Sequence, residues 1–407
     1  MLRCVIIIEI SIYILQGLLY SSDQFKIVGY LPDYRIEAID ISVAEHVTDL
    51  IFFSLEPTAD GRLDDSRFND NILNKLGQIK DGYDIRIHMA LGGWERSSGF
   101  ASMATNDSLR ANFIQELLDF CLSYEFDGVD YDWEFPQNVS ENNTYTALIV
   151  ETKEAFQPFG LIVTTALNVY QNLKVEAYEA LDHIHVMSYD YAGQHATYNQ
   201  AVSDISNFLG RGIAPEKIYL GVPFYGRHIS DRTAYSYSYI VATYNPEPEV
   251  DQVADIYFNG IETIKKKTQF AINKGIGGIM IWEGGQDTRD DTSLLLAIYE
   301  TFISKIKITD FEKNYPEKFT LYQNFPNPFN SSTVISWHVG ATGRSPVQIE
   351  LSIYNVLGQK VVTLISEKQP AGYYEYTFDA STYASGLYYY VLHTEQGMQS
   401  RRMLFIK

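Results

Sequence analysis

Short runs rich in Val, Ile and aromatic residues alternate with segments of helical periodicity from residue 26 to about residue 307. The runs predict strands over residues 26–31, 46–55, 84–91, 126–134, 161–167, 183–189, 217–224 and 277–282. The apolar spacing between them predicts helices over residues 107–124, 143–156, 202–210, 261–273 and 293–306. Strands that alternate with helices are typical of parallel βα units. Eight such strands predict an α/β fold, a (β/α)8 TIM barrel.

A doubly wound open sheet is the alternative arrangement of the same elements. Such a sheet would carry a Gly-rich phosphate turn after its first strand. The residues at that point are Tyr30-Leu31-Pro32-Asp33, which do not form one. The barrel is therefore favoured, and its active site is expected at the carboxyl ends of the strands.

The pattern changes after residue 308. Residues 313–329 are rich in Pro, Asn and aromatic residues, which indicates a linker that leads into a new domain. Short β-rich runs then predict strands over residues 333–339, 347–354, 359–365, 372–379, 386–393 and 400–406. They indicate a small all-β antiparallel sandwich. We divide the chain into a leader over residues 1–22, a barrel over 23–308, a linker over 309–323 and a sandwich over 324–407.

The first residues are organised like a secretory signal peptide. Arg3 precedes an apolar run over residues 5–20, and small polar residues follow. A membrane anchor is the alternative, but the run is short and Glu9 interrupts it. We expect a cleaved signal over residues 1–22 and no stable membrane span.

The formal net charge of −20 argues against nucleic acid and anionic membranes as partners. The chain has two cysteines, and Cys4 would leave with the signal, so no disulfide is expected. Cys121 lies in an apolar periodic segment and is expected to be buried. The histidines are scattered along the chain, so neither a metal nor another cofactor is expected.

Candidate chemistry is concentrated in residues 126–135, whose sequence is FDGVDYDWEF. Alternate side chains of a strand share a face, so Asp130, Asp132 and Glu134 lie together, and Trp133 faces the core on the other side. Neighbouring carboxylates and desolvation both raise carboxyl pKa values. The row therefore predicts a shared proton and one acid that is neutral near neutral pH, as a general acid must be. A calcium-binding loop is the alternative interpretation of these acids. Such loops contain few large apolar residues, so Trp-Glu-Phe-Pro is a poor match to one.

Other predicted strands also end in polar and aromatic side chains. These are Tyr30, Trp94, Met187, Tyr189, Asp190, Tyr225, Arg227 and Trp282. Because the carboxyl ends of barrel strands meet at one face, we expect these residues to gather around Glu134. Their convergence predicts a functional cleft at the mouth of the barrel.

The pattern D-x-x-D-x-D-x-E over residues 127–134 resembles the signature of the family-18 glycoside hydrolases, the chitinase family, with every position filled. The resemblance implies retaining hydrolysis in which the acetamido carbonyl of the substrate is the nucleophile. It implies that Glu134 protonates the glycosidic oxygen and that Asp132 stabilises the oxazolinium intermediate. Asp130 is expected to share a proton with Asp132. Asp127 is expected to be structural.

The same resemblance assigns residues to the substrate. Tyr189 matches the tyrosine that hydrogen-bonds to the acetamido carbonyl, and Trp282 matches the tryptophan beneath the cleaved sugar. Trp94 is expected to form a platform on the leaving-group side. The other expected substrate-binding residues are Tyr30, Met187, Asp190, Tyr225 and Arg227.

The third-strand motif departs from the family pattern. It is usually S-x-G-G, and residues 90–93 read A-L-G-G. The missing hydroxyl normally helps to hold the innermost aspartate, together with a strand-one tyrosine that Tyr30 matches. Ala90 therefore leaves open how the proton is exchanged between Asp130 and Asp132.

The segment between Arg227 and Gly275 is too short for the larger α+β module that walls the groove in many family members. A shallow cleft and mainly internal cutting are expected from this.

The C-terminal sandwich resembles the type A sorting domain of proteins exported by the bacterial type IX secretion system. The resemblance rests on QNFPNPFN at 323–330, IYNVLGQK at 353–360, ASGLYYY at 384–390 and MLFIK at 403–407. It implies a secreted or cell-surface protein of a bacterium with an outer membrane, whose secretion machinery is a partner. A carbohydrate-binding sandwich that uses Tyr388 and Tyr390 is the alternative.

These features together predict a secreted, monomeric chitinase that acts on chitin or other N-acetylglucosamine oligosaccharides. An endo-β-N-acetylglucosaminidase acting on glycoprotein N-glycans shares the signature and stays an alternative. A non-catalytic chitin-binding lectin on the same barrel is the alternative of another class. Such lectins typically lose the terminal acid, whereas Glu134 is present.

Overall fold

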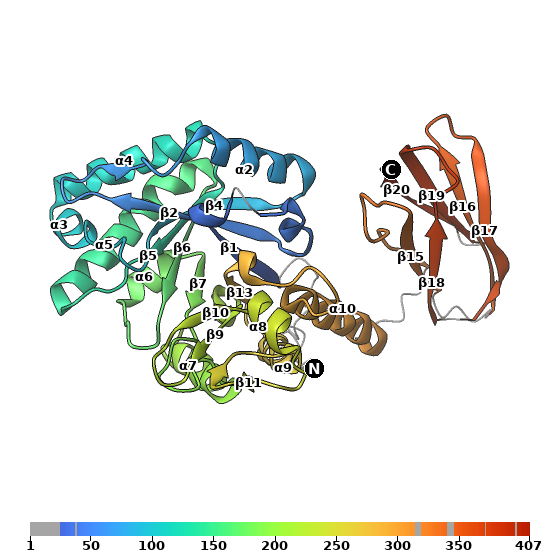
Figure 1. Ribbon diagram of the computed structural model, residues 1–407. Coiled ribbons are helices and arrows are strands. Elements are labelled where there is room, and N and C mark those ends of the chain that lie inside the picture. Colours follow the sequence, from blue (N-terminus) through green and yellow to red (C-terminus); the bar gives the residue numbers. More distant parts are fainter. Residues whose placement is uncertain (1–24, 37–38, 314–318, 340–345, 371, 395–396) are drawn as a thin grey trace, which may run out of the picture. The chain divides into compact units, whose positions relative to one another are not determined.

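The computed structural model describes residues 25–36, 39–313, 319–339, 346–370, 372–394 and 397–407. The expected signal peptide over residues 1–22 and part of the expected linker lie outside these ranges. The chain divides between Ser304 and Lys305 into two compact units (Figure 1).

The first unit is a closed parallel barrel. Its strands are β1 (Lys26–Pro32), β2 (Asp49–Pro57), β4 (Arg86–Gly92), β5 (Gly128–Asp132), β6 (Ile162–Leu167), β7 (His183–Val186), β8 (Ile218–Pro223) and β13 (Gly278–Trp282). They follow one another around the ring in chain order, and β13 pairs with β1 to close it. The short β3 (Leu63–Asp64) pairs antiparallel with β2. The predicted (β/α)8 barrel is confirmed.

Helices surround the barrel (Figure 1). The longer ones are α2 (Asp70–Gly82), α4 (Asp107–Ser123), α5 (Val139–Phe156), α7 (Tyr198–Gly210), α9 (Ile261–Lys274) and α10 (Leu294–Lys313). The shorter ones are α1 (Asp33–Ile36), α3 (Phe100–Ala104), α6 (Val175–Ala180) and the 3-10 turns η1 (Ile41–His46), η2 (Gln157–Phe159), η3 (Pro215–Lys217) and η4 (Gly284–Gln286).

Polar caps define where several of these helices begin. The side chains of Asn69, Asn106 and Asn138 accept hydrogen bonds from backbone N–H groups in the first turns of α2, α4 and α5. Thr197 and Gln200 form a reciprocal capping box at α7. None of the helices that the structure describes has the length and apolar character that crossing a bilayer requires.

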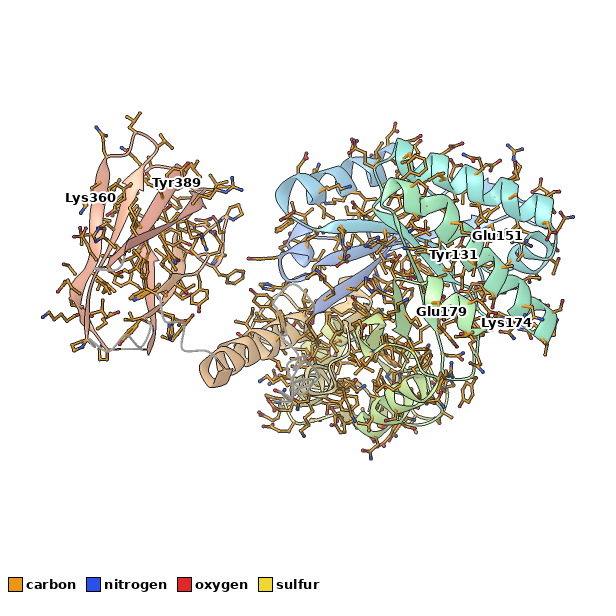
Figure 2. All side chains as sticks on the ribbon, turned by 180° about the vertical axis from the view of Figure 1, so that it is seen from behind. Tyr131, Glu151, Lys174, Glu179, Lys360 and Tyr389 are labelled. Atoms are coloured by element: carbon orange, nitrogen blue, oxygen red, sulfur yellow. The ribbon has the colours of Figure 1, made fainter. Side chains whose placement is uncertain are left out.

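Side chains alternate along and just beyond β5. Tyr131 (labelled in Figure 2) and Trp133 face the helical layer and are buried. The Tyr131 hydroxyl lies 2.7 Å from Oγ1 of Thr152 on α5, and the Trp133 ring stacks on Phe100 with a centroid distance of 5.1 Å. Trp133 is therefore a core residue, as the sequence predicts, and the acids of the same row face the barrel interior.

A small α+β element lies between β8 and α9. Its strands β9 (Tyr225–His228), β10 (Ala234–Ser236), β11 (Gln252–Val253) and β12 (Ile256–Tyr257) form an antiparallel sheet in the order β10-β9-β12-β11. Helix α8 (Tyr237–Tyr244) follows β10. The longest of these strands has four residues, so the element is far smaller than a groove-walling module.

The second unit is an antiparallel sandwich. One sheet contains β14 (Thr320–Leu321), β15 (Ser332–Val339) and β18 (Gly372–Asp379); the other contains β17 (Lys360–Gln369), β16 (Val347–Asn355), β19 (Gly386–Thr394) and β20 (Gly397–Phe405). Trp337 is fully buried between them, and its indole N–H donates to Gln369 Oε1 at 2.9 Å. The predicted sandwich is confirmed.

The two tyrosines of the carbohydrate-binding alternative are not sugar platforms in this sandwich. Tyr390 is fully buried, and its hydroxyl donates to the Tyr322 carbonyl at 2.7 Å. Tyr388 packs against the core, and its hydroxyl donates to the Ala384 carbonyl at 2.9 Å. Their neighbour Tyr389, labelled in Figure 2, is the exposed residue of this run.

Candidate active site

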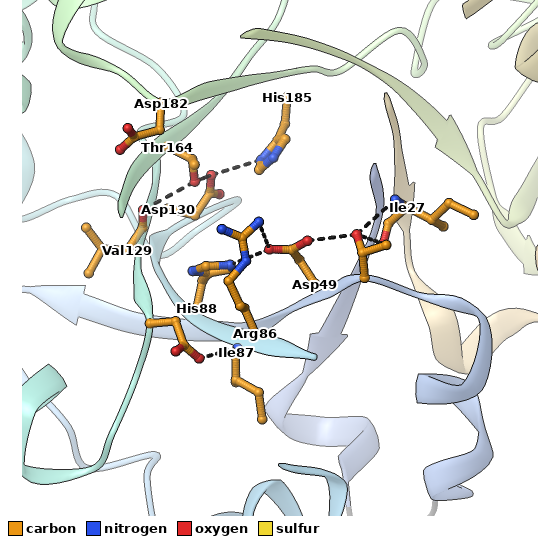
Figure 3. Close-up of polar contacts among 12 residues, drawn as sticks. Ile27, Asp49, Arg86, Ile87, His88, Val129, Asp130, Thr164, Asp182 and His185 are labelled. Atoms are coloured by element: carbon orange, nitrogen blue, oxygen red, sulfur yellow. Dashed lines mark hydrogen bonds and ion pairs between the residues drawn. The ribbon is translucent and has the colours of Figure 1, made fainter. Parts of the chain in front are cut away.

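Asp130 lies inside the barrel with none of its surface exposed. Its Oδ2 accepts a hydrogen bond from the Tyr30 hydroxyl. Its Oδ1 accepts from Thr164 Oγ1 at 2.5 Å and lies 3.0 Å from Nδ1 of His185 (Figure 3). A carboxyl group this deeply buried is stable only when such partners satisfy it. Asp130 is therefore held in place by side chains from β1, β6 and β7.

The register of the barrel explains how this site manages with alanine at position 90. Asp130 pairs with Ala90 on β4 and with Thr164 on β6. The hydroxyl that is missing from one neighbouring strand is thus present on the other. Together with His185, Thr164 supplies the polar contacts at Oδ1 of the innermost aspartate.

Asp132 lies one pleat nearer the mouth and is 3% exposed. Burial, and then the charges of Glu134 and Asp130, raise the pKa of its carboxyl well above the usual range. Its Oδ1 is buried and has no hydrogen-bond partner among the described residues. A buried acceptor without a partner is costly, so this oxygen is suited to accept a hydrogen bond from a bound ligand.

Glu134 lies just beyond the end of β5 and is partly buried. Burial, and then the charge of Asp190, raise the pKa of its carboxyl to about 7, although a hydrogen bond from the Trp94 backbone acts in the opposite direction. The Glu134 N–H donates to Ser97 Oγ at 3.0 Å, and this hydroxyl also donates to the Gly93 carbonyl at 3.0 Å. These bonds hold Glu134 against the loop that follows β4.

A cleft of about 890 Å³ opens at the carboxyl ends of the barrel strands. Both Asp132 and Glu134 face it. Its other lining residues are Tyr34, Phe53, Arg67, Trp94, Glu95, Arg96, Phe135, Asn168, Tyr170, Met187, Tyr189, Asp190, Tyr191, Arg227, Arg232 and Trp282. Eight polar and aromatic residues at the strand ends are expected to gather around Glu134. Six of them line this cleft: Trp94, Met187, Tyr189, Asp190, Arg227 and Trp282.

The other two expected residues, Tyr30 and Tyr225, lie behind the cleft wall. They are 1% and 4% exposed. The Tyr30 hydroxyl donates to Asp130, and the Tyr225 hydroxyl donates to Asp190 Oδ1 at 2.9 Å. Their place in the fold is therefore that of residues that position other side chains, rather than of direct substrate contacts.

Aromatic rings and one neutral hydroxyl line the same cleft as Glu134. Trp282 packs edge-on against Phe53 with a centroid distance of 4.7 Å and lies 5.4 Å from the Tyr30 ring. Burial raises the pKa of Tyr189 well above its usual range, so its hydroxyl stays protonated. The partner of this hydroxyl is Sδ of Met280 at 4.0 Å, a weak acceptor. The hydroxyl can therefore donate to a stronger acceptor on a ligand.

Hydrogen bonds from Tyr225 and Arg227 hold the Asp190 carboxylate. The Arg227 guanidinium donates twice to its carboxylate, and the Nη2–Oδ2 distance is 2.9 Å. Burial would raise the pKa of Asp190, but contacts with His195, Arg227 and Tyr225 outweigh burial and hold the pKa below its usual range. Asp190 is therefore charged, and its charge helps to keep Glu134 protonated.

Asp127, the first acid of the signature, lies outside the cleft. Its Oδ2 accepts from the Ile87 N–H at 2.8 Å and lies 3.2 Å from Lys80 Nζ. It therefore joins β5 to β4 and α2. Within the described ranges, no group of three or more His, Cys, Asp or Glu side chains could hold a metal ion.

Sequence reasoning missed Thr164 and His185, which hold Asp130, and it missed Tyr34 and Tyr170 on the cleft wall. Strand alternation could have placed Thr164 and His185 on the inner face, but their pairing with Asp130 depends on register. An aromatic residue shortly after a strand end was the available signal for Tyr34 and Tyr170.

A carboxylic acid with a raised pKa at the mouth of a barrel, with a second buried carboxyl and aromatic rings in the same cleft, is typical of a glycosidase. Comparison with known proteins agrees with this class. The model of "Glycosyl hydrolases family 18" matches residues 26–287, and that of "Secretion system C-terminal sorting domain" matches residues 323–407. The chain belongs to family 18 of the glycosyl hydrolases. Its sandwich is a type IX sorting domain, which directs export from a bacterium with an outer membrane.

Known relatives and solved structures are similar to the barrel. Probable chitinase 2 of Drosophila melanogaster is 24% identical, over 75% of this chain and 78% of that protein. The crystal structure of the GH18 chitinase ChiB from Flavobacterium johnsoniae is 26% identical, with a TM-score of 0.64, and covers 70% of this chain and 95% of its own. A chitinase from Bacteroides thetaiotaomicron has the same fold at 23% identity and a TM-score of 0.64, over 69% of this chain and 97% of its own.

Proposed function

We propose that this protein is a secreted chitinase that hydrolyses β-1,4 links between N-acetylglucosamine units by substrate-assisted retaining catalysis. The observation that carries the proposal is the pairing of two carboxyl groups in one cleft. Glu134 has a pKa of about 7, and Asp132 beneath it offers a buried oxygen without a partner among the described residues. The first suits an acid that gives up its proton near neutral pH, and the second suits the N–H of an acetamido group.

In the first step, Glu134 gives its proton to the glycosidic oxygen while the substrate's acetamido carbonyl oxygen attacks the anomeric carbon. The Tyr189 hydroxyl, which has only a weak sulfur acceptor, donates to that carbonyl and aligns it. The bond to the leaving sugar breaks and an oxazolinium ion forms. No second carboxylate about 5 Å from the first is needed, because the nucleophile belongs to the substrate.

Asp132 accepts a hydrogen bond from the acetamido N–H and stabilises the positive charge of the intermediate. Burial and the charges of Glu134 and Asp130 raise the pKa of the Asp132 carboxyl, so this group can hold a proton between its two acidic neighbours. In the second step, Glu134 takes a proton from water, which attacks the anomeric carbon from the side that the leaving sugar vacated. The two displacements together retain the anomeric configuration.

Trp282 forms the apolar floor beneath the cleaved sugar, and Trp94, 69% exposed, offers a platform on the leaving-group side. Asp190, Met187 and Arg227 contribute to the wall between them. The small α+β element after β8 supports a shallow groove and internal cutting.

Product analysis on a defined N-acetylglucosamine hexamer tests this proposal. We expect shorter oligomers whose new reducing ends have the β configuration, and no cleavage of the fully deacetylated hexamer, which lacks the nucleophile. An inverted product, or equal cutting of the deacetylated chain, would refute the mechanism. Preferred cleavage of a high-mannose glycopeptide over the hexamer would instead support the N-glycan alternative.

The pH dependence of kcat/KM should show an alkaline limb. Glu134 is active in its protonated form and its pKa is raised to about 7, so the rate should be high below this pH. Above it, the rate should fall about tenfold per pH unit as the proton is lost. The measurement is kcat/KM from pH 4 to 9 with a check of folding by circular dichroism. A profile that stays flat to pH 9 in folded protein is incompatible with this role.

A further inference from the structure

Tyr170 is an exposed aromatic side chain on the wall of the cleft. It is 81% exposed, more than any other large apolar or aromatic side chain of the described residues, and it lines the cavity that contains Glu134. A large ring left in water contributes nothing to the core. On the cleft wall, the ring is available to contact a ligand.

Several hydrogen bonds hold the loop that carries Tyr170. Arg211, at the end of α7, donates through Nη2 to the Val169 carbonyl at 2.6 Å and through Nη1 to the Gln171 carbonyl at 2.5 Å. The Tyr170 N–H donates to Asn168 Oδ1 at 2.9 Å. The backbone on both sides of the ring is thus held by charge-assisted hydrogen bonds from a distant element.

The same loop is bonded directly to the segment that carries the proposed acid. Gln171 is 6% exposed, and its Nε2 donates to the carbonyl of Trp133, the residue before Glu134, at 3.2 Å. Its Oε1 accepts from the Asn168 N–H at 2.9 Å. The backbone that carries Tyr170 is therefore connected directly to the segment that carries Glu134.

Tyr170 follows a strand that neighbours β5 in the barrel, whereas Trp282 ends the strand opposite β5. β4 and β6 flank β5 in the ring, and β13 lies opposite β5. Trp94 follows β4 and Tyr170 follows β6, whereas Trp282 ends β13. The sugar over Trp282 carries the reacting acetamido group in the proposed function. The chain beyond Glu134, on the side of Trp94 and Tyr170, is then the leaving chain.

We infer that Tyr170 is a sugar-stacking platform for the leaving part of the substrate, a second one beside Trp94. The inference rests on the proposed function. An apolar face of an N-acetylglucosamine unit would lie on the tyrosine ring. Because hydrogen bonds already hold the loop, substrate binding would lose less conformational entropy of the loop. The side chain would then favour long chains over substrates that carry no sugar on the leaving side.

The test compares two substrates that differ in their leaving groups. The first is the N-acetylglucosamine hexamer, and the second is N,N′-diacetyl-β-chitobiosyl fluoride, whose leaving fluoride fills no sugar site. Tyr170→Ala should lower kcat/KM on the hexamer about five- to tenfold and leave the fluoride within about twofold of wild type. Tyr170→Phe, which keeps the ring, should restore most of the activity on the hexamer.

Tyr239→Ala is the matched control, because Tyr239 is 47% exposed but does not line the cleft. It should leave both substrates unchanged. Equal losses on both substrates in Tyr170→Ala would show a structural role and overturn the inference, as would an unchanged hexamer rate. A wild-type enzyme that cleaves neither substrate would overturn the proposed function itself, and the platform assignment with it.

Discussion

Replacing Glu134 with Gln should lower kcat on the N-acetylglucosamine hexamer roughly 10³-fold and leave oligosaccharide binding nearly intact. The amide has almost the same shape as the carboxylic acid, but it cannot give a proton to the glycosidic oxygen. It also removes the group whose pKa is raised to about 7, so the residual rate should lose the alkaline limb. Turnover by steady-state kinetics and affinity by calorimetry are the two measurements.

Glu95→Gln provides the matched control for this variant. Glu95 is exposed, lines the same cleft and stands next to Trp94. Its substitution removes a carboxyl group from the same cleft without touching the proposed proton donor. A Glu134→Gln protein that keeps its turnover while losing binding would contradict the assignment, because the lost interaction would then belong to the ground state.

Replacing Asp132 with Asn should lower kcat roughly 10²-fold, with a smaller change in KM. The carboxamide can still accept a hydrogen bond from the acetamido N–H, but unlike the carboxyl group it cannot lose a proton and become negative when the oxazolinium ion forms. It also removes the titratable Asp132 carboxyl, which is 3% exposed and has a strongly raised pKa. The effect should therefore appear in the chemical step, which single-turnover kinetics on the hexamer isolates.

Asp127→Asn separates this electrostatic effect from a general loss of structure. Asp127 belongs to the same row of acids but lies outside the cleft, where it accepts from Ile87 and pairs with Lys80. Its substitution should lower the melting temperature and leave kcat close to that of the wild type. If Asp132→Asn matched wild type in kcat, or if Asp127→Asn lost as much turnover, the proposed role of Asp132 would be refuted.

The barrel strands could be predicted from the chain because each is a buried apolar run between turn residues. Their carboxyl ends could not. The expected strand over residues 183–189 ends at Val186, so Tyr189 and Asp190 belong to the loop that follows. The expected strand over 126–134 ends at Asp132 in the same way. At the mouth of the barrel, the backbone stops pairing with the neighbouring strands and continues as loops that carry polar side chains. The pattern of apolar residues does not show where this pairing stops.

The partners of the innermost aspartate show a second limit. Thr164 and His185 lie 34 and 55 residues from Asp130 along the chain. Their contact follows from the shear of a closed barrel, which sets Asp130 beside Thr164. The same register shows why Ala90 is tolerated at the neighbouring position of β4. No local pattern contains this information.

The sequence by itself determined the alternation that makes the barrel and the sandwich, and it determined the acid row, because two-residue periodicity alone puts Asp130, Asp132 and Glu134 on one face. Only the tertiary structure decided which tyrosines stand behind the carboxylates and which, like Tyr170, face the cleft. Exposure at the mouth depends on ring closure and on loops held by distant residues such as Arg211. Those long-range contacts exist only in the folded chain, so the shape of the surface around Glu134 cannot be read from local sequence.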